Sequence, residues 1–132
     1  MLFERVGQVL VLAHGAKDPS DAEWNEYAAS FESCQRSEAP VSGLLVVTQG
    51  GAPNAGQRKA VIAIAALRPL TTCVCTNSMV ARGVITALRW LSDAPMHGLR
   101  LDEIDTALRL LNVPAQAHAD VKAVVARLQR QL

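Results

Sequence analysis

Short apolar runs that alternate with helix-forming segments are the feature that most constrains the fold of this chain. Residues 9–13 and 44–47 are continuous apolar runs, and residues 71–75 are rich in β-prone side chains. Uninterrupted runs of this kind are typical of strands that are covered on both faces. Short connections between alternating strands and helices favour right-handed βαβ units. The order of elements therefore predicts an α/β fold with a mixed or parallel sheet.

The first helix has the clearest signals. Ser20 and Glu23 have the spacing of a capping box at a helix start. The apolar side chains that follow recur at i, i+3, i+4 and i+7, which places them on one face of a helix; they are Trp24, Tyr27, Ala28 and Phe31. We expect this helix to extend to about Gln35.

A second helix begins after the glycine turn at residues 49–53. Asn54 and Gln57 repeat the capping-box spacing, and Pro69 ends a segment that we expect to remain helical to about Leu67. Residues 60–67 are apolar almost all the way round, so a single buried face cannot account for them. The helix is therefore either enclosed within the monomer or in contact with a partner.

The remaining elements follow from turn and capping signals. The first apolar region, residues 2–13, is either one strand or a short hairpin that pivots at Gly7. After residues 71–75 we expect a helix over 79–91, a break at 92–95, an extended piece over 96–101, a helix over 103–111 capped by Asp102, and a last helix ending at 132. The last helix carries an apolar stripe at Val121, Val124, Val125 and Leu128. We expect one domain over residues 1–112, with residues 113–132 as an amphipathic helix packed on it or on a partner.

Composition excludes several classes of protein. The chain has 132 residues, of which 50% are hydrophobic and 19% charged, and its net charge is +1. This apolar content argues against disorder, and the balanced charge argues against a nucleic-acid reader. No apolar stretch is long enough for a membrane span. The first residues lack the pattern of a signal peptide, so we expect a cytoplasmic protein.

The number of cysteines is also consistent with a cytoplasmic protein. Cys34, Cys73 and Cys75 are odd in number and cannot form a closed set of disulfides. Cys73 and Cys75 lie two residues apart in a β-prone run, so both point to one face of the strand. We interpret them as small core side chains. No histidine lies close to them in the sequence, so no metal site is expected.

The sequence contains partial matches to two catalytic motifs. Gly51 and Gly56 have the glycine spacing of a phosphate-binding loop, but Gln57 and Arg58 replace the Lys-Ser/Thr pair that would hold phosphate and magnesium. Six residues separate Cys75 from Arg82, whereas cysteine phosphatases have five between nucleophile and arginine. We therefore expect no enzyme activity and no cofactor.

His14 is the one histidine at an informative place. It ends the first parallel strand, at the edge of the sheet where α/β proteins often bind ligands. It is either a polar strand end or part of a site for a small anionic or lipid-like ligand, together with Arg58 and Arg82. A ligand sensor is therefore the alternative to a protein-binding module.

The layout as a whole resembles a STAS-like domain, of the anti-sigma-factor-antagonist type found as a stand-alone bacterial protein. The resemblance covers roughly residues 1–112. It rests on the opening strand, on residues 19–24, on residues 44–51, on Thr76-Asn77-Ser78 before Arg82, and on the helix over residues 101–111. It implies a sheet of four or five strands with helices mostly on one face, and a non-catalytic role in protein–protein regulation. The C-terminal helix over residues 113–132 is expected in addition to this fold.

The resemblance also implies partners and a mode of control. Members of the family bind a regulatory protein or kinase, and phosphorylation of a Ser or Thr before the second helix switches binding. This chain has no Ser or Thr between Gln49 and Lys59, which leaves Thr48 and Ser78 as candidates. We expect the loop and helix at residues 49–67 to contact a regulatory protein or a second copy of the chain. The residues expected there are Gly50, Gly51, Asn54, Arg58, Lys59 and Ile62.

Overall fold

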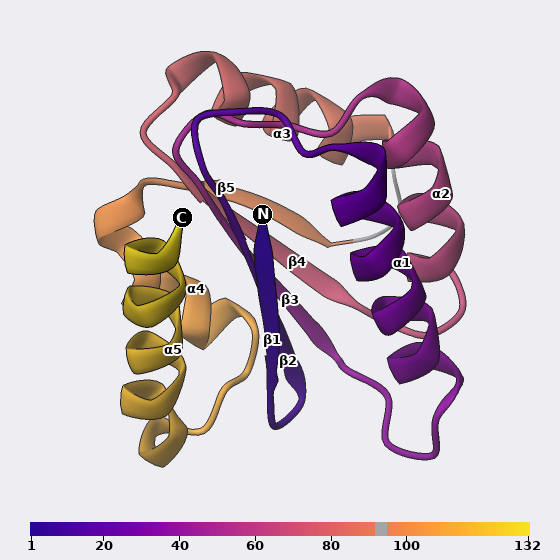
Figure 1. Ribbon diagram of the computed structural model, residues 1–132. Helices are drawn as coiled ribbons and strands as arrows, with labels where there is room; N and C mark the ends of the chain where they lie inside the picture. Colours follow the sequence, from indigo (N-terminus) through magenta and orange to yellow (C-terminus); the bar gives the residue numbers. More distant parts are fainter. Residues whose placement is uncertain (92–94) are drawn as a thin grey trace.

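A five-stranded sheet forms the centre of the molecule, and its strands lie side by side in the order in which they occur along the chain (Figure 1). The structure is a computed structural model that describes residues 1–91 and 95–132. The strands are β1 (Leu2–Val6), β2 (Val9–His14), β3 (Gly43–Thr48), β4 (Thr71–Thr76) and β5 (Met96–Leu99). The predicted α/β class with a mixed sheet and a C-terminal helix is confirmed.

β1 is antiparallel to β2, and the other strands are parallel to β2. Of the two alternatives for the first apolar region, the structure contains the hairpin, since Gly7 has φ 59 between β1 and β2, a conformation that glycine adopts without strain. In the parallel part, His14 pairs with Thr48 and Thr48 pairs with Thr76. These three residues therefore form a row at the carboxyl edge of the sheet.

Three helices cover one face of the sheet: α1 (Asp21–Arg36), α2 (Ala55–Ala65) and α3 (Met79–Leu91). The capping box of Ser20 and Glu23 is confirmed by hydrogen bonds in both directions. The aromatic stripe of α1 is buried against Leu10 and Leu12 of β2, together with Ile64 of α2. This packing fixes α1 and α2 over the centre of the sheet.

The opposite face is covered by α4 (Ile104–Leu110) and α5 (His118–Gln131). Val121, Val125 and Leu128 of α5 belong to one buried cluster with Cys73 and Cys75 of β4. The interpretation of these two cysteines as core side chains is confirmed. α5 lies along β1 and β2, and Arg127 of α5 forms an ion pair of 2.6 Å with Glu4 of β1.

Several predicted boundaries were wrong. α2 ends at Ala65 instead of Leu67, and β5 ends at Leu99 instead of residue 101. Asp102 does not cap the fourth helix: residues Leu101–Glu103 form a short 3-10 turn, and Glu103 accepts a hydrogen bond from the amide of Arg100. The predicted break at 92–95 lies outside the described residues at positions 92–94.

Candidate functional site

The turn after β3 is closed by the last side chain of the strand. The Thr48 hydroxyl donates to the carbonyl oxygen of Gly51 at 2.7 Å and accepts from the amide of Gly50 at 3.0 Å. Gly50 has φ 131, which favours glycine. Thr48 therefore holds the turn, and Gly50 supplies the backbone conformation that the turn requires.

Gly51 lies where this turn meets the loop after β2. Its amide donates to the carbonyl oxygen of Gly15 at 2.9 Å, and the next amide, of Ala52, donates to Asp18 Oδ1 at 2.9 Å. A Cβ atom at position 51 would overlap the carbonyl oxygens of Lys17 and Gly15. The glycine is needed for this close approach of two backbones, and it is buried.

The start of α2 is joined firmly to α1. The predicted capping box is confirmed, because the Gln57 amide donates to Asn54 Oδ1 at 2.9 Å and the Asn54 amide donates to Gln57 Oε1 at 3.0 Å. The buried Gln57 side chain also donates to Asp21 Oδ1 at 2.9 Å. Trp24 Nε1 donates to the carbonyl oxygen of Gln57 at 2.9 Å. Sequence reasoning recognised Gln57 as a capping residue but could not show these contacts with α1.

The outward side of α2 presents the rest of the expected partner-binding residues. Arg58 and Lys59 are exposed, and Arg58 Nη1 donates to the carbonyl oxygen of Pro53 at 2.7 Å. Ile62 is 67% exposed, which is high for a large aliphatic side chain in the middle of a helix. Gly51 and Asn54 thus support the local structure, whereas Gly50, Arg58, Lys59 and Ile62 face outward.

α3 adds apolar side chains that the sequence reasoning did not single out. Met79 is 78% exposed, Val80 is 79% exposed and Val84 is also exposed. Their spacing places them on one side of the helix, away from Ile85, which is buried. The signal available in the sequence was the cluster of apolar residues at the start of a helix with few charges.

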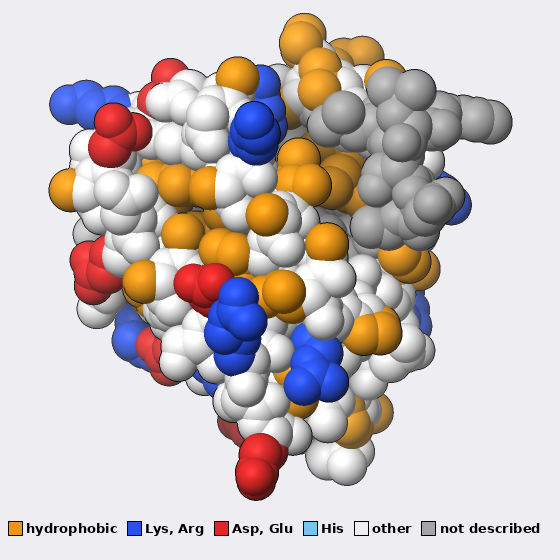
Figure 2. Space-filling view, turned by 90° about the vertical axis from the view of Figure 1, so that its right-hand side faces the viewer, with side chains coloured by type: hydrophobic (Ala, Val, Ile, Leu, Met, Phe, Trp, Pro, Cys, Tyr) orange, Lys and Arg blue, Asp and Glu red, His pale blue; other side chains and the backbone are white. Residues whose placement is uncertain are grey.

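We call the exposed residues of the two helices the α2–α3 surface; it consists of Arg58, Lys59, Ile62, Leu67, Met79, Val80 and Val84. Figure 2 shows the side of the molecule on which α1 and α2 lie, and apolar side chains gather over its upper and central part with Lys and Arg among them. The apolar side chains in the central part of this view lie close together, and such groups mark interaction surfaces more often than isolated side chains do.

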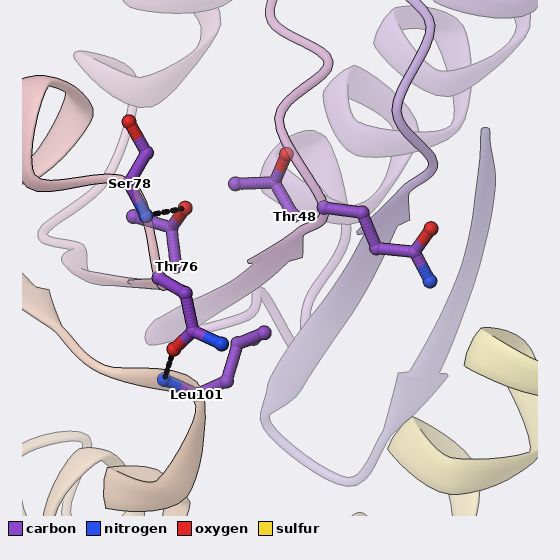
Figure 3. A pocket seen from close by; sticks show the side chains of 6 residues that line it. Thr48, Thr76, Ser78 and Leu101 are labelled. Carbon is purple, nitrogen blue, oxygen red and sulfur yellow. Dashed lines mark hydrogen bonds between the residues drawn. The ribbon is translucent and has the colours of Figure 1, made fainter.

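A shallow cavity of about 220 Å³ opens at the carboxyl edge of the sheet, between the ends of β3 and β4. It is lined by Thr48, Gln49, Thr76, Asn77, Ser78 and Leu101. Figure 3 shows Thr48 on one side, Thr76 and Ser78 on the other, and Leu101 below them. The Thr76 hydroxyl accepts from the Ser78 amide at 3.2 Å, and Asn77 Oδ1 accepts from the Leu101 amide at 3.4 Å. The cavity is smaller than most small-molecule sites.

The His14 side chain, at the end of β2, is buried against Trp24 of α1. It is 3% exposed and stacks on Trp24 with ring centroids 6.0 Å apart. Burial, with a smaller contribution from the charged amino terminus, lowers the pKa of His14 to about 4. The side chain is therefore neutral at pH 7. The described cavity at the carboxyl edge is lined by none of His14, Arg58 and Arg82.

The two candidate phosphorylation sites differ in accessibility. Thr48 is buried, and its hydroxyl is engaged in the glycine turn. Ser78 is half-buried beside the open cavity, and its hydroxyl accepts from the amide of Ala81 at 3.1 Å at the start of α3. A phosphate on Ser78 would lie at a helix N-terminus, where negative charge is favourable. Of the two, Ser78 is the position that a kinase can reach without opening the turn.

The buried thiols are poor nucleophiles. Burial raises the pKa of Cys73 to about 11, and burial together with Cys73 raises the pKa of Cys75 to about 12. The thiolate, which is the reactive form, is therefore scarce at neutral pH. Among the residues that the structure describes, no group of three or more His, Cys, Asp or Glu side chains is arranged to hold a metal ion.

No helix in the described part of the chain has the length and apolar character required to cross a membrane. Comparisons of the chain with models of protein families, with curated proteins and with solved structures find no match.

Proposed function

We propose that this protein is a non-catalytic regulatory module of STAS type, which binds another protein through the loop and helix at residues 49–67. The observation that carries the proposal is the exposure of Ile62 on a helix whose first turn is held rigidly against α1. A fixed apolar side chain is ready to bind without the entropic cost of ordering the helix.

The topology supports the family part of the proposal. An antiparallel hairpin followed by consecutive parallel strands, with connecting helices on one face, agrees with the architecture that the STAS resemblance implies. The high pKa values of Cys73 and Cys75 support a role other than thiol catalysis. The alternative function, a sensor of a small anionic or lipid-like ligand, has less support, because His14 is buried and neutral.

The test compares Ile62→Glu with Leu132→Glu, a substitution at another exposed apolar residue. Both variants should unfold within about 0.5 kcal/mol of the wild type, because neither side chain is buried. Proteins retained from an extract of the source cells should be the same for the wild type and Leu132→Glu, and a regulatory partner should be lost with Ile62→Glu. Calorimetry with the purified partner should reproduce that difference. Equal retention by all three proteins would refute a role for α2 in binding.

A further inference from the structure

All the charged residues of α2 and α3 are basic. Residues 39–92 contain no Asp or Glu, although the whole chain has 12 acidic residues. The cations of this stretch are Arg58, Lys59, Arg68, Arg82 and Arg89. The outer layer formed by α2 and α3 is therefore basic in a protein whose net charge is only +1.

Among the residues that the structure describes, none of these cations forms an ion pair. The ion pairs among the described residues lie in α1, in the segment before α4, and where α5 meets α4 and β1. Arg58 and Arg68 donate only to carbonyl oxygens, of Pro53 and Gln35. In Figure 2 the acidic side chains of the described residues lie to the left of centre. The positive charge is thus available to a partner.

The apolar residues of this layer border an incompletely covered part of the sheet. α2 packs against α1, whereas α3 lies over β5, and Figure 1 shows that α2 and α3 run in different directions. Val74 of β4 is only half-buried, although Cys73 and Cys75 on either side of it are fully buried in the opposite core. Alternation along the strand places Val74 on the side of α2 and α3. Val74 is therefore a partly exposed apolar residue on the side of the sheet that α2 and α3 cover.

We infer that the partner contributes an acidic amphipathic segment, which lays its apolar side chains on the α2–α3 surface and its carboxylates against the cations of α2 and α3. The inference rests on the proposed function and names the chemistry of its partner. Apolar contact would supply most of the affinity, while the opposite charges would accelerate encounter and exclude basic partners.

Two other occupants fit the surface less well. A symmetric contact with a second copy would place the same surface on both sides, so the cations of one copy would face those of the other. A bilayer presents a flat surface, whereas α2 and α3 run in different directions, so it cannot contact both helices as fully as a segment that follows them. A peptide segment meets both requirements, because it carries acids and can follow the surface of the two helices.

The probe is a phage-displayed library of random peptides, selected against the full chain. The peptides that are enriched should be acidic, with apolar residues at i, i+3 or i+4. For one synthesised peptide, Arg58→Glu/Lys59→Glu should weaken binding by about tenfold or more, and so should an increase in salt from about 0.1 M to about 1 M. The control Arg109→Glu/Arg130→Glu changes the net charge equally on exposed residues of α4 and α5, and should leave binding within about twofold.

The outcomes separate this inference from the proposed function. Enriched peptides that are neutral or basic but lose binding with Ile62→Glu would overturn the acidic partner and leave docking on α2 intact. Peptides whose binding is unaffected by Ile62→Glu and by the charge reversal would overturn both. Binding to phosphatidylserine vesicles without any peptide enrichment, or a concentration-dependent dimer abolished by Ile62→Glu, would overturn the inference in favour of a membrane or of a second copy.

Discussion

Gly51 and Gly56 have the spacing of a nucleotide-binding motif, but the structure uses them in different ways. Gly51 is buried where its amide donates to Gly15, and a Cβ atom there would come within 2.7 Å of the Gly15 carbonyl oxygen. Gly56 is exposed in the first turn of α2, where a Cβ atom would meet only Asn54 Oδ1 at 3.5 Å. Their roles are therefore structural, and they differ in how well they tolerate a side chain.

We expect Gly51→Ala to lower the free energy of unfolding by about 2 kcal/mol or more, because two backbone segments must move apart. Gly56→Ala should raise it by about 0.5 kcal/mol, since alanine favours a helix. Urea denaturation of the two variants measures both effects. Equal stabilities would contradict the close backbone approach at Gly51.

His14 should make stability depend on pH. Its pKa is about 4 in the folded protein, below its ordinary value of 6.5. The unfolded chain therefore binds a proton that the folded protein does not, and stability falls as the pH is lowered from about 6.5 towards 4, by up to about 3 kcal/mol.

Urea denaturation between pH 7 and pH 5 measures this slope. Glu23 does not interfere there: its contact with the amino terminus lowers its pKa to about 2 from 4.5, so its contribution is lost only at lower pH. His14→Phe should remove most of the slope, whereas His97→Gln should keep most of it. An unchanged slope in His14→Phe would show that His14 is not the group responsible.

At the scale of elements, α5 completes the core on the second face of the sheet. Leu128 is buried in the cluster that contains the two cysteines of β4, whereas Leu132, just beyond the helix, is 40% exposed. Leu128→Ala should therefore lower the free energy of unfolding by about 2–4 kcal/mol, through lost burial and a residual cavity. Leu132→Ala should stay within about 0.5 kcal/mol of the wild type. Thermal unfolding of the two variants tests whether α5 is part of the core.

The elements that the sequence predicted well are those with local signals. The capping boxes at Ser20 and Asn54 depend on residues within a few positions of one another, and both were predicted. The hairpin at Gly7 was one of two alternatives that the local signal allowed. The end of α2 was not, because Ala66 and Leu67 are good helix formers and nothing local stops the helix at Ala65. Asp102 has the residue type of a cap, but the 3-10 turn leaves that role to Glu103.

The candidate site was less predictable because its geometry depends on contacts between distant residues. Gln57 bonds to Asp21, and Trp24 bonds to the backbone of Gln57, across more than thirty positions of the chain. His14 was placed correctly at the end of a strand, but its stacking on Trp24 depends on how α1 crosses the sheet. The exposure of Met79 and Val80 likewise depends on which side of α3 meets β5.

At the scale of the whole molecule, the sheet separates two hydrophobic cores, and Cys73 and Cys75 are buried in one of them. Cys34 on α1 is only half-buried. In the folded protein at pH 8, a thiol reagent should modify Cys34 much faster than the other two cysteines, because burial raises their pKa values. All three should react at similar rates in denaturant. Mass spectrometry of the labelled protein distinguishes the sites, and rapid native labelling of Cys75 would contradict its burial.

The packing of α5 on β1 and β2 affects how the protein folds while it is being translated. The strands pair with their neighbours in the chain, so the sheet and its first helix layer can assemble as the ribosome delivers them. The side of the sheet that carries Val9, Val11 and Leu45 is covered by residues 118–131, which are translated after all five strands. A chain interrupted before that point would leave this apolar side bare, open to chaperones and to aggregation.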